Sequence, residues 1–250
     1  MNECIKQLTL HTSIRKFTSE PINEDVVQTI ITATQQSPSW INGQQMSIIR
    51  ITDYDKRQQL QQLAGNQQYV GEAAEFWVFC LDFHRSQLAC AIEQKPFAIA
   101  DNIDALIVGA TDVGIALGTA VVAAESFGLG TVPIGGVRKD AEAVIELLGL
   151  PQYVYPISGL CIGHKNETPL IKPRLPQQAV VFTNEYQLPG NAIKQYNETF
   201  SNYMIQRTNG LNSSNWSSGI ATFYSEPFYR DNSYTNALTA LQKQGFLAQK

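Results

Sequence analysis

The sequence has only four cysteines, and their positions do not suggest a disulfide framework. Cys4, Cys80, Cys90 and Cys161 include no Cys-x-x-Cys pair and show no regular spacing. The first residues also lack the charged segment followed by an apolar one that marks a secretory signal peptide. We therefore expect reduced thiols and a cytoplasmic protein.

The sequence also lacks a long apolar run and an excess of basic residues. The longest uncharged apolar stretch in the middle of the chain, residues 113–124, is shorter than the about 20 residues of a membrane span. A net charge of −4 does not favour nucleic acid, because binding its phosphates needs a basic face. The 250 residues, 44% hydrophobic and 16% charged, are typical of a globular protein with one large or two small domains. We expect neither a membrane nor a nucleic-acid partner.

Motifs for hydrolysis, metal binding and nucleoside triphosphate binding are absent. The sequence contains no His-Glu-x-x-His, no Gly-x-Ser-x-Gly and no Gly-x-x-x-x-Gly-Lys-Ser/Thr, and its three histidines have no ligand spacing. Gly128 and Gly130 resemble the start of a dinucleotide fingerprint, but Pro133 stands where the third glycine belongs. These two glycines therefore indicate a helix end. A bound cofactor would have to supply any chemistry.

Hydrophobic periodicity predicts an α+β fold with a mostly antiparallel sheet, since helices and strands do not alternate regularly. Helices are expected over residues 3–11, 21–35, 53–63, 101–127, 140–148 and 191–206, with more helix near the end. Strands are expected over residues 46–51, 76–81, 131–134 and 155–162. The helix over 101–127 is rich in glycine and alanine, which indicates close packing in the core or across a dimer axis.

Two short basic clusters are the strongest candidates for a ligand site. One is His11-Thr12-Ser13-Ile14-Arg15-Lys16-Phe17 and the other is Lys172-Pro173-Arg174. Arginine and lysine together suit a phosphate group, although basic residues in loops are commonly just solvated. Gly135-Gly136 after a strand would let the backbone approach a flat ring, or would form a plain turn. Ser39, Asn42, Gln44 and Gln67 are polar groups suited to the edge of a heterocycle, or to solvent.

Taken together and in order, these segments resemble the nitroreductase family over nearly the whole chain, and most of all its subgroup of NADPH-dependent, oxygen-insensitive nitroreductases and flavin reductases. The matching stretches are residues 11–17, 47–51, 73–79, 123–130, 134–138, 172–176, 206–210 and 216–217. Each stretch alone is weak, but so many in register are specific.

The resemblance implies a homodimer that binds two FMN molecules at the subunit interface, in an α+β sandwich whose sheet is completed by the partner's C-terminal arm. It also implies an FMN-binding core over residues 1–190. A helical extension over residues 191–250 would contribute to the dimer and to the reductant site.

The resemblance assigns cofactor roles to residues from several segments. His11, Ser13 and Arg15, joined by Lys172 and Arg174, would hold the phosphate and ribityl oxygens. Ser39, Gln44 and Gln67 would meet the ribityl chain or the ring edge. The backbone of Pro133, Ile134, Gly135 and Gly136 would lie beside the ring.

The activity implied by the resemblance is ping-pong transfer of hydride from NADPH or NADH to nitro compounds, quinones or free flavin. The flavin N5 carries the chemistry, so no catalytic residue and no metal are predicted. The alternatives are a flavin-binding carrier or sensor with little turnover, and an interaction dimer without cofactor.

Three departures from the family pattern leave the reductant open between NADPH and NADH. Thr12 replaces a usual basic residue, and the loop over residues 38–43 lacks the serine-rich character of this subgroup. The tail reads Tyr224-Ser225-Glu226-Pro227, where relatives carry basic residues. Arg207 remains as the candidate reductant-binding residue, and Arg230 is a candidate substitute for the missing ones. The physiological electron acceptor also stays open.

Overall fold

The computed structural model describes residues 1–225 and 234–247, which form parts of two compact units. The first unit comprises Met1–Pro169 with Ser233–Lys250, and the second comprises Leu170–Asn232. These limits differ from the predicted division at residue 190 for two reasons. Within the second unit, the Tyr196 hydroxyl donates to the carbonyl of Pro173 at 2.7 Å. Near the C-terminus, Phe246 packs into the core of the first unit. The division of binding roles between the two regions stays a prediction.

The predicted helices and strands lie close to their expected positions, and the structure adds α4 and α5, which were not predicted. The first unit contains the helices α1 Glu3–Thr9, α2 Glu24–Gln35, α3 Tyr54–Leu63, α4 Gln68–Glu72, α5 His84–Ile92, α6 Ile103–Ser126, α7 Ala141–Leu148 and α11 Ala237–Lys243. Its strands are β1 Met46–Arg50, β2 Glu75–Asp82, β3 Gly130–Ile134 and β4 Val154–Gly163. Its short 3₁₀ turns are η1 Trp40–Asn42, η2 Ile99–Asp101, η3 Gly135–Arg138 and η5 Tyr234–Asn236. Asp53 caps α3 as expected, because its carboxylate accepts from the Lys56 amide at 2.8 Å.

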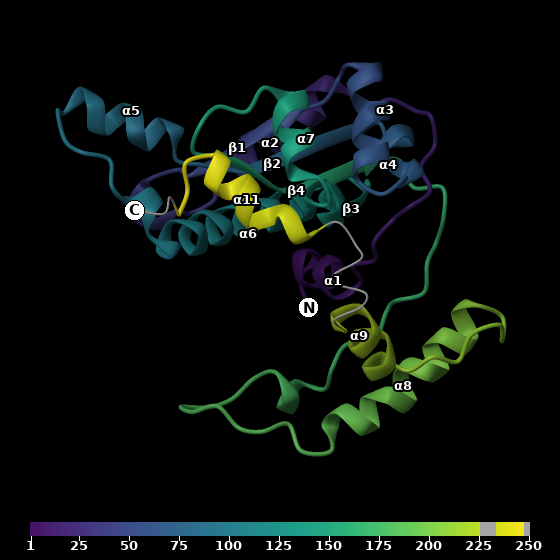
Figure 1. Cartoon of the computed structure of the whole chain (residues 1–250). Coiled ribbons are helices and arrows are strands. Elements are labelled where there is room, and N and C mark those ends of the chain that lie inside the picture. The colour runs from purple at the N-terminus through teal and green to yellow at the C-terminus, as the bar shows by residue number, and fades with distance from the viewer. Residues whose placement is uncertain (226–233, 248–250) are drawn as a thin grey trace. The chain divides into compact units, whose positions relative to one another are not determined.

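The four strands form one antiparallel sheet in the order β1-β2-β4-β3, which confirms the predicted α+β class. The strands β1 and β3 are therefore the two edges. The register pairs Met46 with Leu81 at one end of the sheet and Thr131 with Ile162 at the other. In Figure 1, α6 lies along one side of this sheet, and α3, α4 and α7 lie on the other.

Both faces of the sheet are covered, which explains the nearly continuous apolar sequence of β2. Trp77, Phe79 and Leu81 pack toward α2 and α6, while Phe76 and Val78 pack toward α3, α4 and α7. Successive side chains of a strand point to opposite faces, so a strand buried on both sides shows no polar alternation. The free thiols of Cys80 and Cys161 lie in the second of these cores.

The helix α6 is long and apolar enough by composition to cross a bilayer, the one such helix among the described residues. One of its faces packs on the sheet through small buried side chains, including Ala105, Gly109, Ala116 and Ala120. At Gly109 a Cβ would lie 2.9 Å from the Leu81 Cβ, so this glycine permits the close approach. The prediction of a core helix is confirmed for this face.

The second unit contains η4 Gln177–Ala179, α8 Ala192–Arg207 and α9 Trp216–Tyr224. The two helices are joined by polar and aromatic contacts. The Asn197 side chain donates to Ser217 Oγ at 2.7 Å and accepts from the Ser217 amide at 2.9 Å. The rings of Tyr196 and Trp216 meet edge to face, with centroids 5.7 Å apart.

Candidate functional site

Eight of the predicted site residues in the first unit lie around β3 and the segment beside it. We call this group the β3 corner, and it comprises His11, Ser13, Arg15, Gln67, Pro133, Ile134, Gly135 and Gly136. Ser13 forms a parallel bridge with Thr131, and the Ile14 amide donates to the Thr131 carbonyl at 2.9 Å. The basic segment therefore runs along the outer edge of β3.

A second pairing fixes the basic segment from its other side. Phe17 bridges Lys165 in antiparallel fashion, just beyond the end of β4. Glu167 Oε1 accepts from the amides of Arg15 at 2.5 Å and Lys16 at 3.0 Å. The carboxylate occupies these backbone donors, so Arg15 would hold an anion through its exposed guanidinium.

The far end of β3 brings Gln67 against Gly136. A Cβ on Gly136 would lie 2.3 Å from the Ala64 carbonyl oxygen and 2.6 Å from Gln67 Nε2, so only glycine fits. Gln67 Nε2 donates to the Ala64 carbonyl at 2.6 Å, and its Oε1 accepts from the Tyr69 hydroxyl. These contacts hold the Gln67 amide in place beside the glycine turn.

The four residues from Pro133 to Gly136, which are predicted to lie beside the flavin ring, differ in their exposure to solvent. Pro133 is exposed and Gly135 is half-buried, whereas Gly136 and the Ile134 side chain are buried. Ile134 belongs to the core between the sheet and α3, α4 and α7. A ligand at this position would therefore meet the backbone of Ile134 rather than its side chain.

Ser39 and Gln44 lie elsewhere, at the start of β1. Together with Arg85 and Asp112 they line a cavity of about 390 Å³, and we call these four residues the β1 corner. Ser39 Oγ accepts from the Gln44 amide at 3.1 Å. Arg85 fixes the start of the strand, because its guanidinium donates to the Gln44 carbonyl at 2.7 Å.

The loop of the β1 corner is strained and incompletely satisfied. Ile41, Asn42 and Gln44 have positive φ values of 48°, 54° and 52°, which is costly for a β-branched residue such as Ile41. Asp112 is buried and accepts from the Trp40 amide at 3.2 Å through Oδ1, while its Oδ2 has no hydrogen-bond partner. Strain and an unpaired buried carboxylate oxygen are both features that a binding partner can relieve.

The β1 corner and the basic segment of the β3 corner lie at diagonally opposite parts of one sheet. Three strand spacings, about 14 Å, separate β1 from β3, and the β1 corner lies at the opposite end of the strands from the basic segment, which pairs with the start of β3. One chain therefore does not bring Ser39 and Gln44 together with Arg15.

Lys172, Arg174 and Arg207 belong to the second unit. The Arg174 guanidinium donates to the carbonyl of Lys172 at 2.8 Å, and all three side chains are exposed. Arg207 is in the last turn of α8. Arg230, the candidate substitute, and the Glu226-Pro227 part of the tail motif lie outside the described residues.

Sequence reasoning gave no role to two acidic residues that organise the β3 corner. Glu167 caps the backbone after Arg15, and Glu125 accepts from His11 Nδ1 at 2.7 Å. The position of Glu125 in the sequence could have indicated its role. It lies in the last turn of a 24-residue helix, where the helix dipole disfavours a carboxylate. A charge in that position suggests that it has a partner.

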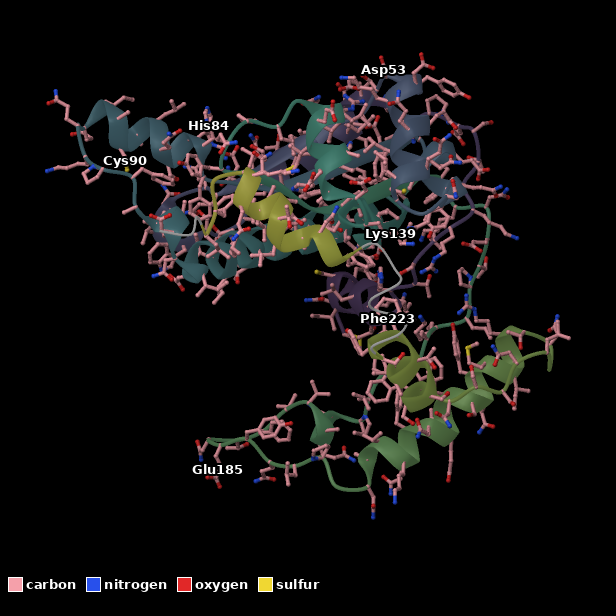
Figure 2. All side chains as sticks on the ribbon, in the orientation of Figure 1. Asp53, His84, Cys90, Lys139, Glu185 and Phe223 are labelled. Atoms are coloured by element: carbon pink, nitrogen blue, oxygen red, sulfur yellow. The ribbon has the colours of Figure 1, made fainter. Side chains whose placement is uncertain are left out.

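In the described part of the chain, no three His, Cys, Asp or Glu side chains gather in a group that could hold a metal ion. Figure 2 shows that Asp53, which precedes α3, lies far from His84 at the start of α5.

A model described as the nitroreductase family matches residues 9–164, and a model of the C-terminal domain of that family matches residues 172–249. The chain belongs to the nitroreductase family. The resemblance stated from the sequence is therefore confirmed.

Relatives within the nitroreductase family resemble the whole chain. It is 44% identical over 255 residues to FMN reductase [NAD(P)H] of Bacillus subtilis, covering 100% of both chains. The structure of B. megaterium NfrA2 matches with a TM-score of 0.95 at 43% identity, covering 100% of both chains. The NADPH:FMN oxidoreductase of Vibrio harveyi, solved with NAD⁺, matches with a TM-score of 0.87 at 38% identity, covering 99% of this chain and 100% of that one.

Proposed function

We propose that this nitroreductase-family protein is an FMN-dependent NAD(P)H oxidoreductase that reduces nitro compounds, quinones or free flavin. The observation that carries the proposal is the β3 corner, where a cationic segment and a glycine turn lie at the two ends of one strand. Relatives named as FMN reductases and NADPH-flavin oxidoreductases support the activity and the cofactor.

The β3 corner has the dimensions and donors for an extended ligand with an anionic end. From Thr131 to Gly135 the strand advances about 13 Å, which is on the scale of an extended FMN. Arg15 and His11 would hold the phosphate at one end. Gln67 and the backbone from Pro133 to Gly136 would line the ring at the other.

The short chain segment between Glu167 and Lys172 supports the proposal that Lys172 joins Arg15 at the cofactor phosphate. Glu167 is hydrogen-bonded to the Arg15 and Lys16 amides, and Lys172 is five positions further along the chain. A five-residue segment reaches at most about 18 Å. This short connection supports the proposed place of Lys172 beside Arg15.

When bound, FMN supplies hydride transfer between the nicotinamide and the acceptor. The residues around it bind and orient rather than exchange protons. Arg15, Lys172 and Arg174 contribute positive charge, which favours an anionic cofactor. The glycine turn gives the ring close access to backbone. Arg207 is the proposed contact for the reductant.

The separation of the two corners supports a homodimer with shared sites. Ser39 and Gln44 can meet a flavin held by the β3 corner if they come from the partner subunit. The face of α6 directed away from the sheet supports such an interface. Ile103 and Ile107 are more than half exposed on it, and Gly114 and Gly118 have nothing within 4 Å of a built Cβ. The free state of all four cysteines supports a reducing cytoplasm.

The test is optical and needs only purified protein. We expect a yellow protein whose flavin absorbance bleaches when NADPH or NADH is added without oxygen. Comparison of the bleaching rates with the two nucleotides determines the preferred reductant. A yellow protein that neither nucleotide bleaches would identify a carrier or sensor. A colourless protein that FMN cannot reconstitute would identify an interaction dimer.

A further inference from the structure

The imidazole of His11 is held by a carboxylate from a different part of the chain. His11 Nδ1 lies 2.7 Å from Glu125 Oε1, and the Glu125 side chain is 10% exposed. The His11 ring is 28% exposed, so it retains access to solvent or to a ligand. The contact joins the basic segment to the end of α6.

Glu125 is itself fixed by a second hydrogen bond. The hydroxyl of the fully buried Thr131 donates to the same Oε1 atom at 2.8 Å. Thr131 also binds the backbone beside Ser13, through its bridge and through the Ile14 amide. One carboxylate therefore connects α6, β3 and the segment that carries His11.

This arrangement determines which nitrogen of His11 faces outward. A carboxylate only accepts hydrogen bonds, so Nδ1 must carry the proton that it donates to Glu125. The other nitrogen, Nε2, is left for a ligand. An anion at Nε2 also needs a proton there, and the ring is then a cation between two anions. Glu125 balances that charge.

We propose that Glu125 is a positioning residue for the cofactor phosphate: it orients His11 and stabilises the imidazolium that binds a phosphate monoester through Nε2. This inference rests on the proposed function and adds to it a residue that does not touch the cofactor.

The test compares the affinities of the apoprotein for FMN and for riboflavin, which lacks the phosphate. Glu125→Gln keeps the shape and an acceptor oxygen but removes the charge. We expect FMN to bind about tenfold to a hundredfold more weakly, with riboflavin affinity unchanged. Glu142→Gln is the matched control, because Glu142 pairs with Lys243 at 2.5 Å and is outside the site.

A double-mutant cycle separates positioning from a general structural role. If Glu125 acts through His11, the Glu125→Gln change has no further effect on FMN affinity in a His11→Ala background. Equal losses in both backgrounds, or equal losses for FMN and riboflavin, would overturn the proposal.

Nitrogen NMR of the three histidines tests the same point in the unmodified protein loaded with FMN. The His11 Nδ1 and Nε2 resonances should both report protonated nitrogens. An unprotonated Nδ1 would refute the proposed geometry, even if Glu125→Gln failed to fold. Wild-type protein that binds no FMN would instead refute the proposed function. Wild-type binding of FMN with full retention in Glu125→Gln would refute this inference alone.

Discussion

The β3 corner and the β1 corner differ in how complete they are within one chain. Around the β3 corner, Gln67, His11 and the Arg15 amide all have partners from the same chain. At the β1 corner, the Asp112 Oδ2 atom is buried without a partner, and three neighbouring loop residues have positive φ. Those polar groups of the β3 corner are paired within one chain. The unpaired, buried oxygen of the β1 corner indicates that a ligand or a second chain supplies its missing partner. In the proposed dimer, the cofactor held at the β3 corner of one subunit would reach the β1 corner of the other.

The largest expected effect is at the glycine turn of the β3 corner. Gly136→Ala forces a Cβ against the Ala64 carbonyl, and overpacking of this kind costs about 1–3 kcal/mol. We expect urea unfolding to show a loss of that size, together with weaker FMN binding.

Gly135→Ala is the matched control for that change. A Cβ at Gly135 meets its nearest atom, Arg138 Nη2, only at 3.6 Å. Similar losses in both variants would show that the turn needs backbone freedom rather than the close approach seen at Gly136.

The second expected effect is at the phosphate end of the same corner. Arg15→Ala removes a charge-assisted contact and should weaken FMN retention by about 1–3 kcal/mol in a fluorescence titration. Lys56→Ala, which removes a cation from α3, is the control. Unchanged FMN affinity in Arg15→Ala would remove Arg15 from the site.

A smaller loss of FMN binding free energy, of about 1 kcal/mol for each lost neutral contact, tests whether one cofactor site combines the two corners from different subunits. Gln44→Asn shortens the side chain and keeps a residue type that tolerates positive φ. In a heterodimer of Arg15→Ala and Gln44→Asn chains, a shared site leaves one cofactor site intact and gives the other both changes. FMN titration should therefore show half of the sites with wild-type affinity.

The two variant homodimers provide the reference affinities. If both corners served a cofactor within one chain, every site of the heterodimer would carry one change, and no site would reach wild-type affinity.

The smallest expected effect concerns acid stability and is outside both corners. Hydrogen bonding to Arg50 lowers the pKa of Glu24 to about 2. A carboxyl group whose pKa is lower in the folded state contributes stability above its unfolded value of 4.5 and loses it as the pH falls toward 2. Because Glu24 is exposed, Glu24→Gln should reduce the slope of the urea midpoint between pH 4.5 and pH 2 only slightly. An unchanged slope would show that the Arg50 contact is not maintained in solution.

Much of the fold could be predicted because its local signals are strong. The strand β2 is apolar on both faces, and Asp53 marks the start of α3. The limits of the two units were not predictable, because the return of α11 to the first core depends on contacts that are distant in sequence.

The sequence identifies candidate site residues, whose roles stay predictions, but it does not give their arrangement. The motifs locate Arg15 and Gln44, but the order β1-β2-β4-β3, which separates them, is not visible in any local pattern. Asp112 was missed because a single acidic residue inside a helix carries no signal of burial.

The two thiols buried in the sheet affect how this protein would withstand the quinones proposed among its electron acceptors. Burial raises the pKa of Cys80 to about 12 and raises that of Cys161 as well. A thiol attacks electrophiles as its thiolate, so both groups stay unreactive at neutral pH. Quinones are electrophiles as well as electron acceptors. Covalent damage during turnover should therefore fall on the exposed Cys4 of α1 and the half-buried Cys90 of α5, and leave the core unmodified.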